Sequence, residues 1–548
     1  MTPMQRFRSL LRVDKKDIYQ IILYSILSGI ISLSLPLGIQ SIVNFLQAGK
    51  VSTSWVVLVI IVVAGVAMVG IFRIMQYRIT ENLQQKIFVR SSFEFAYRFP
   101  KIKFTKLYPY SPPELANRFF DTLTVQKGVA KLLLDISGAA LQIIFGIVLL
   151  SLYHSFFIFF GAFLILLLYL IFRLNFYSGL NTSLKESNYK YKVAHWLQEI
   201  ARNHMSFKNN NLFNYSLDKN DGLVNKYLNS RESHFTILRR QFIQLTGFKV
   251  LITAGLLIIG GILVLNQQMN IGQFVAAEII ILTIITAVEK LFSAIELLYD
   301  VLTSLEKIGK VVDMDLEEEN EGAYTIGDQK IDIEVKDLSY KFPDMDQYIL
   351  KNLSLTIQQG DHILIDGANG AGKTTLVRLL SRVIEPTGGT IFINDTNYNK
   401  YSLDDYRSNI GSISVNDNVF EGTILENITC KNPNISLAKV HEVIDKLQLS
   451  DYLKSLPNGL DTEVHSQGKQ LTSSVIEKVL LARCILSKPK ILFLEEPLDN
   501  VDIESAKQII DYLTAADKNW TLVVISKNEY WKHKCNKKFF LTEGTIKA

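Results

Sequence analysis

The chain has 548 residues, which is more than one domain normally uses, so at least two folding units are expected. Hydrophobic residues make up 48% of the chain and the mean hydropathy is positive, which argues against an entirely soluble protein. The net charge of +5 is too modest to indicate nucleic-acid binding, and three cysteines without a Cys-x-x-Cys pair indicate neither a disulfide framework nor a zinc site.

The N-terminal segment, residues 1–17, is basic and amphipathic. The apolar run that follows it is too long for the core of a signal peptide, and no cleavage site with small residues stands out. We therefore interpret this run as an uncleaved first membrane span that begins in the cytosol.

Six apolar segments are long enough to cross a membrane as helices, since about 20 residues are needed for this. Pro36 predicts a kink in the first of them. An all-α transmembrane domain is therefore expected over residues 1–310. The predicted spans lie at about residues 18–45, 55–75, 129–152, 156–173, 248–265 and 271–288.

The connections between the spans alternate in length and charge. Residues 47–50, 153–154 and 266–270 form short loops with one lysine among them, whereas the second and fourth connections are long and rich in Lys and Arg. Because basic loops stay in the cytosol, both termini and both long connections are expected there. Residues 78–90 have helical periodicity, so the spans are expected to continue as long cytosolic helices.

Two charged residues lie within or beside the predicted spans. Lys249 is near the cytosolic end of the fifth span, and its amine is expected to extend toward the membrane surface. Glu278 lies inside the sixth span, where a carboxylate is costly, so it is either paired with another group or part of a cargo path. An acidic linker is then expected over residues 311–330, followed by a soluble domain over residues 331–548.

The soluble half contains a glycine-rich segment at residues 367–375 that fits the P-loop pattern. It lies between an apolar, strand-like run and a helix-like run, as that motif requires. Backbone N–H groups of such a loop surround phosphate oxygens, Lys373 can reach the β- and γ-phosphates, and the Thr374 hydroxyl can ligate Mg²⁺. The alternative, a glycine-rich turn without a ligand, does not explain this context. The expected nucleotide-binding residues are Gly367, Asn369, Gly370, Ala371, Gly372, Lys373, Thr374 and Thr375.

Further segments resemble those of ABC transporters of the exporter type. Residues 491–494 read as a buried strand that ends in two carboxylates, like a Walker B strand, and residues 498–502 resemble the D-loop. Residues 422–428 and 462–468 resemble the family segments that precede the signature motif. Residues 114–121 resemble its first coupling region.

The resemblance covers nearly the whole chain and implies a half-transporter: six spans followed by an α/β P-loop NTPase domain, the ATP-binding cassette. Such proteins form dimers that hold two ATP molecules with Mg²⁺ between their cassettes, and they move a substrate across the cell's inner (cytoplasmic) membrane. The second half of the chain is similar to bacterial peptide and protein secretion exporters. The resemblance also implies contact with membrane lipid and allows a periplasmic adaptor as partner.

Several roles follow from the resemblance. Phe342 takes the place of the aromatic residue that stacks on adenine, with Tyr340 as the alternative. Glu496 takes the place of the general base that polarises the attacking water. Glu495 stands where the family has an aspartate that supports Mg²⁺, and its extra methylene group is expected to weaken that role.

Three positions depart from the family pattern. The signature L-S-G-G-Q is replaced by residues 471–475, in which Ser473 and Ser474 carry side chains where glycines allow close approach to the γ-phosphate. Thr472 retains a hydroxyl. The Q-loop glutamine aligns with Val415, or with Asn416 after a shift of one residue. The switch histidine aligns with Lys527, which can hold a phosphate by charge but cannot relay a proton as histidine does.

These departures predict ATP binding with slow or absent intrinsic hydrolysis. The first hypothesis is a transport ATPase subunit that moves a peptide, a lipid or a small hydrophobic molecule, as a homodimer or as a heterodimer with a second half-transporter. The second is a regulatory or scaffold subunit that binds ATP and leaves hydrolysis to its partner. A nucleotide-gated channel or receptor is the third, although no filter-like segment is evident in the spans.

Overall fold

The computed structural model describes all residues except 48–52, 318–323, 344 and 548. Most of the first predicted loop and the centre of the predicted acidic linker therefore lie outside the described residues. The chain forms two compact units. Unit 1 contains Met1–Lys101 and Tyr110–Met314, and unit 2 contains Ile102–Pro109 and the residues from Asp315 onward.

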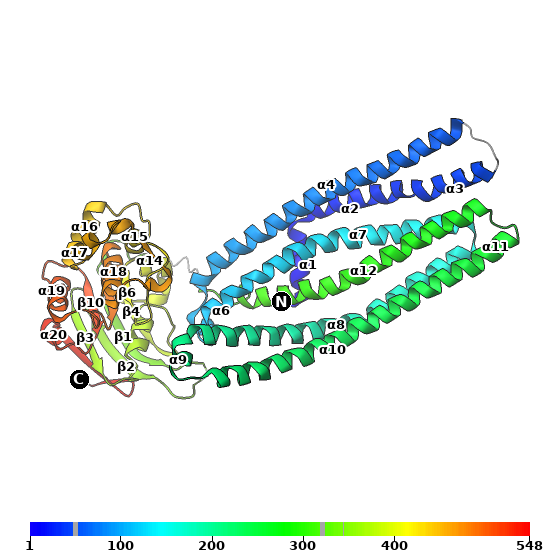
Figure 1. The fold of residues 1–548 in the computed structure, drawn as a ribbon. Coiled ribbons are helices and arrows are strands. Elements are labelled where there is room, and N and C mark those ends of the chain that lie inside the picture. The colour runs from blue at the N-terminus through cyan, green and yellow to red at the C-terminus, as the bar shows by residue number, and fades with distance from the viewer. Residues whose placement is uncertain (48–52, 318–323, 344, 548) are drawn as a thin grey trace. The chain divides into compact units, whose positions relative to one another are not determined.

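The secondary-structure elements of unit 1 are all helices among its described residues (Figure 1). Six of its helical segments are long and apolar enough to cross a membrane, which confirms the six predicted spans. The first span breaks at Leu33, three residues before Pro36, where a kink was predicted. The helices are α1 (Pro3–Val13), α2 (Lys15–Ser32), α3 (Ser34–Gln47), α4 (Thr53–Arg98), α6 (Pro112–Asn117), α7 (Asp121–Tyr153), α8 (Phe156–Arg202), α9 (His204–Asn209), α10 (Phe213–Gly255), a π-helical turn (Leu256–Gly260), α11 (Gly261–Leu265) and α12 (Ile271–Val312), with short 3-10 turns at Phe99–Lys101 and Arg118–Phe120.

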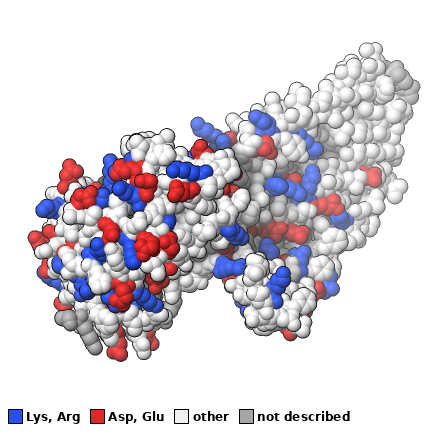
Figure 2. All heavy atoms as spheres, turned by 60° about the vertical axis from the view of Figure 1, so that its left-hand side comes forward, with Lys and Arg blue, Asp and Glu red and all other residues white. Residues whose placement is uncertain are grey.

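Small residues allow the long helices of unit 1 to approach closely. A Cβ atom at Gly128 of α7 would lie 2.3 Å from Val301 of α12, and one at Gly179 of α8 would lie 2.4 Å from the ring of Tyr299. Close helix packing through glycine is typical of membrane proteins. Figure 2 shows that the end of this unit where α3 and α4 meet is almost free of charged side chains, as a membrane-embedded surface requires.

The charged residues of the last two spans differ in their surroundings. Lys249 of α10 forms an ion pair with Glu289 of α12, so its amine is held within the bundle and does not extend freely as predicted. Glu278 is exposed on this chain and makes no hydrogen bond or ion pair with any described residue.

Unit 2 contains a six-stranded sheet in the order β12-β11-β3-β10-β9-β6. The pairing of β11 with β12 is antiparallel, and the other four pairings are parallel. A four-stranded antiparallel sheet in the order β2-β1-β4-β5 and the pair β7-β8 complete it. The strands are β1 (Ile333–Tyr340), β2 (Leu350–Ile357), β3 (His362–Gly367), β4 (Gly388–Ile393), β5 (Thr396–Asn397), β6 (Ile410–Ile413), β7 (Gly422–Thr423), β8 (Glu463–Val464), β9 (Ile491–Glu495), β10 (Thr521–Ile525), β11 (Lys537–Thr542) and β12 (Thr545–Lys547).

The predicted phosphate-binding and catalytic segments all follow strands of the six-stranded sheet. Strands β3, β10, β9 and β6 run parallel, so their carboxyl ends meet at one edge, which is where α/β folds place ligands. The fold class is thus confirmed as an α/β domain after a helical membrane domain. The helices of unit 2 are α5 (Phe104–Leu107), α13 (Lys373–Leu380), α14 (Leu403–Ser408), α15 (Ile424–Thr429), α16 (Leu437–Lys446), α17 (Ser450–Ser455), α18 (Ser473–Leu486), α19 (Ile503–Leu513) and α20 (Glu529–Lys534).

A segment from the first half of the chain belongs to unit 2. Ile102–Pro109 carries α5 and joins the later residues of that unit: the Lys103 N–H donates to the carbonyl of Asp315 at 3.0 Å, and the Arg378 guanidinium lies 5.0 Å from the centre of the Phe104 ring. This segment lies upstream of residues 114–121, which resemble the family's coupling region but belong to unit 1.

Candidate functional site: a nucleotide and Mg²⁺ site

The P-loop connects β3 to α13 with a backbone that only glycine adopts easily. Gly367 has φ +145° and Gly372 has φ +102°. A Cβ atom at Gly367 would lie 2.2 Å from the carbonyl oxygen of Leu541 on the neighbouring strand β11. Because α13 begins at Lys373, its free N–H groups and positive end point into the loop, which is the arrangement that binds phosphate.

The Lys373 side chain lies over this loop. Its ammonium group donates to the carbonyl oxygens of Gly367 at 2.7 Å and Ala368 at 2.9 Å. These acceptors hold the charge at the mouth of the loop. A phosphate entering the loop therefore meets a positioned cation.

Three oxygen-bearing side chains meet beside the P-loop, at the ends of β9 and β6. The Thr374 hydroxyl donates to one carboxylate oxygen of Glu495, and the Ser414 hydroxyl donates to the other at 2.9 Å. Glu495 is buried. The extra methylene of Glu495, relative to aspartate, thus does not keep its carboxylate from Thr374.

Oxygen atoms of this kind are the ligands that Mg²⁺ prefers. The cluster therefore fits the metal ion that the resemblance implies, with Thr374 and Glu495 as the residues that would hold it. Ser414 was not among the residues predicted from the sequence.

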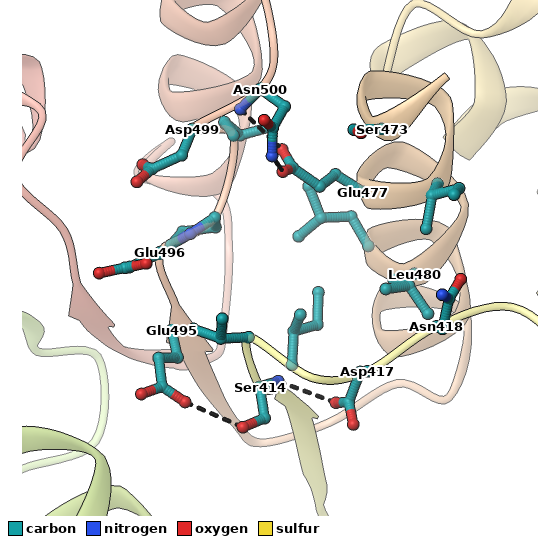
Figure 3. Close-up of a pocket in the computed structure, with 16 residues that line it drawn as sticks. Ser414, Asp417, Asn418, Ser473, Glu477, Leu480, Glu495, Glu496, Asp499 and Asn500 are labelled. Atoms are coloured by element: carbon teal, nitrogen blue, oxygen red, sulfur yellow. Dashed lines mark hydrogen bonds between the residues drawn. The ribbon is translucent and has the colours of Figure 1, made fainter. Parts of the chain in front are cut away.

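Glu496 begins a sharp turn after β9. It has φ +49°, its N–H donates to the Ile525 carbonyl at 2.7 Å, and Leu498 has φ +69°. Figure 3 shows the side chains of Glu496 and Asp499 pointing to the same side of this turn. Partial burial, followed by the charges of Glu496 and Glu477, raises the pKa of Asp499, while Lys527 lowers it. The turn thus places the half-buried Glu496 carboxylate near that of the exposed Asp499.

A cavity of about 250 Å³ joins several of the predicted positions (Figure 3). Glu495, Glu496, Val415 and Ser473 all line it, together with Ser414. Val415 is 58% exposed, so the position aligned with the Q-loop glutamine offers a hydrophobic side chain at the surface. Lys527 does not line this cavity; it is exposed beyond the end of β10.

The residues that replace the signature motif form the start of α18. Thr472 caps this helix: its hydroxyl accepts a hydrogen bond from the Val475 N–H at 3.4 Å. Ser473 is exposed and Ser474 is half-buried. The helix start thus keeps free N–H groups for an anion, but with side chains at both positions where the family has glycine.

Phe342, the residue predicted to stack on adenine, is buried. The Tyr108 ring stacks on it, with centroids 4.8 Å and planes 19° apart, and Tyr340 contacts it edge-on at 5.2 Å. Tyr340, the alternative, is itself buried, and its hydroxyl lacks a hydrogen-bond partner among the described residues. Nothing in the sequence marks Tyr108 as a neighbour of Phe342, because 234 residues separate the two.

Comparisons with known proteins agree with this geometry. Residues 350–499 match the family model described as "ABC transporter". The whole-chain fold is similar to a solved bacterial Atm1-family ABC exporter with ATP bound, with a TM-score of 0.86, 18% identity, and coverage of 98% of this chain and 95% of that one. At that identity the likeness concerns the fold alone.

Curated relatives are similar over part of the chain. The alpha-hemolysin translocation ATP-binding protein HlyB of Escherichia coli O157:H7 is 27% identical over 307 residues, which cover 56% of this chain and 43% of HlyB. The ABC transporter BEA3 of Gibberella fujikuroi is 31% identical over 217 residues, which cover 39% of this chain and 17% of BEA3. The similarity thus spans less than half the length of these relatives.

Proposed function

We propose that this chain, whose residues 350–499 belong to the ABC transporter family and whose fold is that of an ABC exporter, binds ATP to drive movement of a substrate across a membrane. It acts as a half-transporter with domains at residues 1–310 and 331–548, paired with a second half-transporter or a second copy. Its spans lie in the inner (cytoplasmic) membrane with both termini in the cytosol. A peptide, a lipid or a small hydrophobic molecule is the cargo, and a periplasmic adaptor is a further partner.

The observation that carries this proposal is the meeting of Lys373, Thr374 and Glu495 at one edge of the sheet. The ammonium group at the P-loop mouth attracts the β- and γ-phosphates, while Thr374 and Glu495 present oxygens for Mg²⁺. Mg²⁺, when bound, neutralises negative charge on those phosphates. Glu496 follows directly and is the carboxylate that would orient and deprotonate a water molecule.

Hydrolysis by this chain is proposed to be slow. Val415 cannot hydrogen-bond the water or the metal ion, and Ser473 and Ser474 occupy space at the helix end that would face a partner's γ-phosphate. Lys527 can hold a phosphate but not relay a proton. In a heterodimer the partner could supply an intact signature to this P-loop, whereas the other site would still face the serines.

Two measurements on the purified full chain test the proposal. Saturable binding of ATP with Mg²⁺ is expected, with loss of binding in Lys373→Ala. ATP turnover well below one per second is expected from the chain alone. Turnover of several per second that Glu496→Gln abolishes would overturn the claim of slow hydrolysis, and no saturable binding would overturn the proposal as a whole.

The second candidate is a regulatory or scaffold subunit, which the joint departures at Val415, Ser473, Ser474 and Lys527 favour. Transport assays in sealed vesicles separate the two candidates. A transport subunit predicts ATP-dependent flux that Lys373→Ala removes. A scaffold subunit predicts no flux from this chain on its own and an unchanged flux when Lys373→Ala is combined with its partner.

A further inference from the structure

We propose that unit 1 holds a binding site for a small organic anion with two or three negative charges, in a cavity of about 550 Å³ between α2, α4, α7 and α12. This inference rests on the proposed transport function and narrows its cargo to molecules that carry several carboxylate or phosphate groups. The volume is in the range of sites for small organic molecules.

The cavity is lined by one stripe from each of three helices. On α7 the stripe runs through Lys127, Lys131, Asp135 and Gln142, at spacings of four, four and seven residues that place them on one face. The stripes on α4 and α2 have spacings of three and four residues, which also place their members on one helix face. They contain Arg73, Gln76, Thr80 and Gln84 on α4, and Ser25, Ser28 and Ser32 on α2.

The charges in this cavity are predominantly positive. Arg73, Lys127, Lys131 and Lys290 line it together with a single carboxylate, Asp135, so four cations against one anion leave three positive charges. An anionic ligand with two or three charges would balance this excess.

None of these five groups forms an ion pair or a side-chain hydrogen bond with a described residue of the chain. Two other cations of α4 are paired: Lys86 with Asp17 at 2.6 Å and Arg90 with Asp14 at 3.0 Å. Charges at the end of a membrane span are costly unless they have a partner or a function.

The spacing on α7 adds to this cost. Lysines four residues apart on a helix repel each other and destabilise it. Lys127 and Lys131 stand in that relation and both face the cavity. Asp135, four residues after Lys131, offsets part of this repulsion. Further negative charge in the cavity would offset the rest, which is the behaviour of an anion site.

Hydrogen bonds between the helices stabilise the cavity that these charged residues line. Gln76 is buried, and its amide donates to the Ile21 carbonyl at 3.0 Å and to the Ser25 hydroxyl at 2.7 Å. The Ser25 and Ser137 hydroxyls are 2.9 Å apart. These bonds tie α2, α4 and α7 together, so the cavity is held open by packed helices and not by a loop.

The test is direct binding of carboxyfluorescein, a small aromatic polyanion, to the full chain in nanodiscs of zwitterionic lipid, followed by fluorescence anisotropy. Rhodamine 6G, a cation with a similar ring system, is the control ligand and is expected not to bind saturably at this site. Lys127→Gln, Lys131→Gln and Lys290→Gln are each expected to weaken dye binding about threefold or more, because each removes one attractive charge. Lys226→Gln on α10, an exposed lysine outside the cavity, is the matched control and leaves binding unchanged.

The variant Asp135→Asn distinguishes a change in charge from a folding defect. It removes the one repelling carboxylate, so it is expected to tighten dye binding about threefold. A variant that merely misfolds would weaken binding instead. Equal affinity in wild type, Lys131→Gln and Asp135→Asn, or preference for the cation, would overturn the proposal.

Competition identifies the source of the anion. Displacement of the dye by citrate indicates a soluble polyanion. Displacement by cardiolipin, a lipid with two phosphates, added to the nanodisc indicates a lipid head group. Both support an anion site. Binding of ATP with Mg²⁺ is measured on the same samples. Dye binding without ATP binding contradicts the proposed function and leaves the cavity assignment intact. ATP binding without dye binding contradicts the cavity assignment and leaves the proposed function intact.

Discussion

The Tyr108 ring stacks face to face on Phe342, with centroids 4.8 Å apart. This contact joins the segment Ile102–Pro109 to the residue at which adenine is expected to stack, and both belong to unit 2. Phe342 is only 7% exposed, so a nucleotide base cannot lie on its covered face until Tyr108 moves. Nucleotide affinity should therefore depend on this tyrosine.

Tyr108→Ala is expected to tighten binding of ATP with Mg²⁺ about two- to tenfold, since aromatic pairs contribute roughly 0.5–1.5 kcal/mol that adenine must otherwise replace. Fluorescence titration with a labelled nucleotide measures this. Tyr348→Ala, which removes an exposed ring of the same unit, is the control and leaves affinity unchanged. Weaker binding in Tyr108→Ala would mean that the tyrosine supports the base and does not compete with it.

Ser414→Ala is expected to lower both stability and affinity for ATP with Mg²⁺. The Ser414 hydroxyl is the donor to one oxygen of the buried Glu495 carboxylate, and loss of such a partner costs about 1–3 kcal/mol. Thermal unfolding and nucleotide titration at fixed Mg²⁺ report the two effects. Ser412→Ala, in the same strand β6 with an exposed side chain, should change neither; equal behaviour of the two variants would contradict a role for Ser414.

The three cysteines are expected to differ strongly in reactivity. Burial raises the pKa of Cys484 and of Cys535 to about 12, so at pH 8 only about one thiol in ten thousand is ionised. Because pH 8 lies far below both pKa values, raising it to 9 increases the thiolate fraction tenfold but leaves it small. Cys430 is exposed. Iodoacetamide at pH 8 followed by peptide mass spectrometry should modify Cys430 alone in the folded chain and all three after unfolding.

The sequence predicts those features of the structure that depend on residues close together in the chain. The six spans and the P-loop follow from apolar length and from a contiguous glycine pattern, and the structure has six helices long and apolar enough to cross a membrane. The partner of Lys249 was not predictable, because Glu289 lies on another helix 40 residues away. The contact of Tyr108 with Phe342 was not predictable either, because the two residues are far apart in the sequence.

Contacts between distant segments were also not predictable in the nucleotide site. Glu495 was expected to serve Mg²⁺ less well than aspartate because of its extra methylene. In the fold, the Thr374 and Ser414 hydroxyls each donate a hydrogen bond to one oxygen of the Glu495 carboxylate. Ser414 reaches Glu495 because β6 pairs with β9, and this pairing cannot be read from the residue type at position 495. Ser414 carries one weak signal in the sequence, a hydroxyl at the end of a strand beside Val415.

Restoration of the family residues is the sharpest test of slow hydrolysis. The variant Ser473→Gly/Ser474→Gly removes two side chains at the start of α18 while Thr472 still caps that helix. Val415→Gln supplies a hydrogen-bonding amide at the cavity that Glu495 and Glu496 line, and Lys527→His supplies a group that can relay a proton.

The four substitutions combined are expected to raise the ATP turnover of the full chain at least tenfold, a change of about 1.4 kcal/mol in the barrier. Any one alone should give less, because the groups act on the same phosphate. Adding Glu496→Gln to the combined variant is the control and should abolish the gain. If the combined variant binds ATP with Mg²⁺ as tightly as the natural chain yet hydrolyses it no faster, the slow step lies outside these positions.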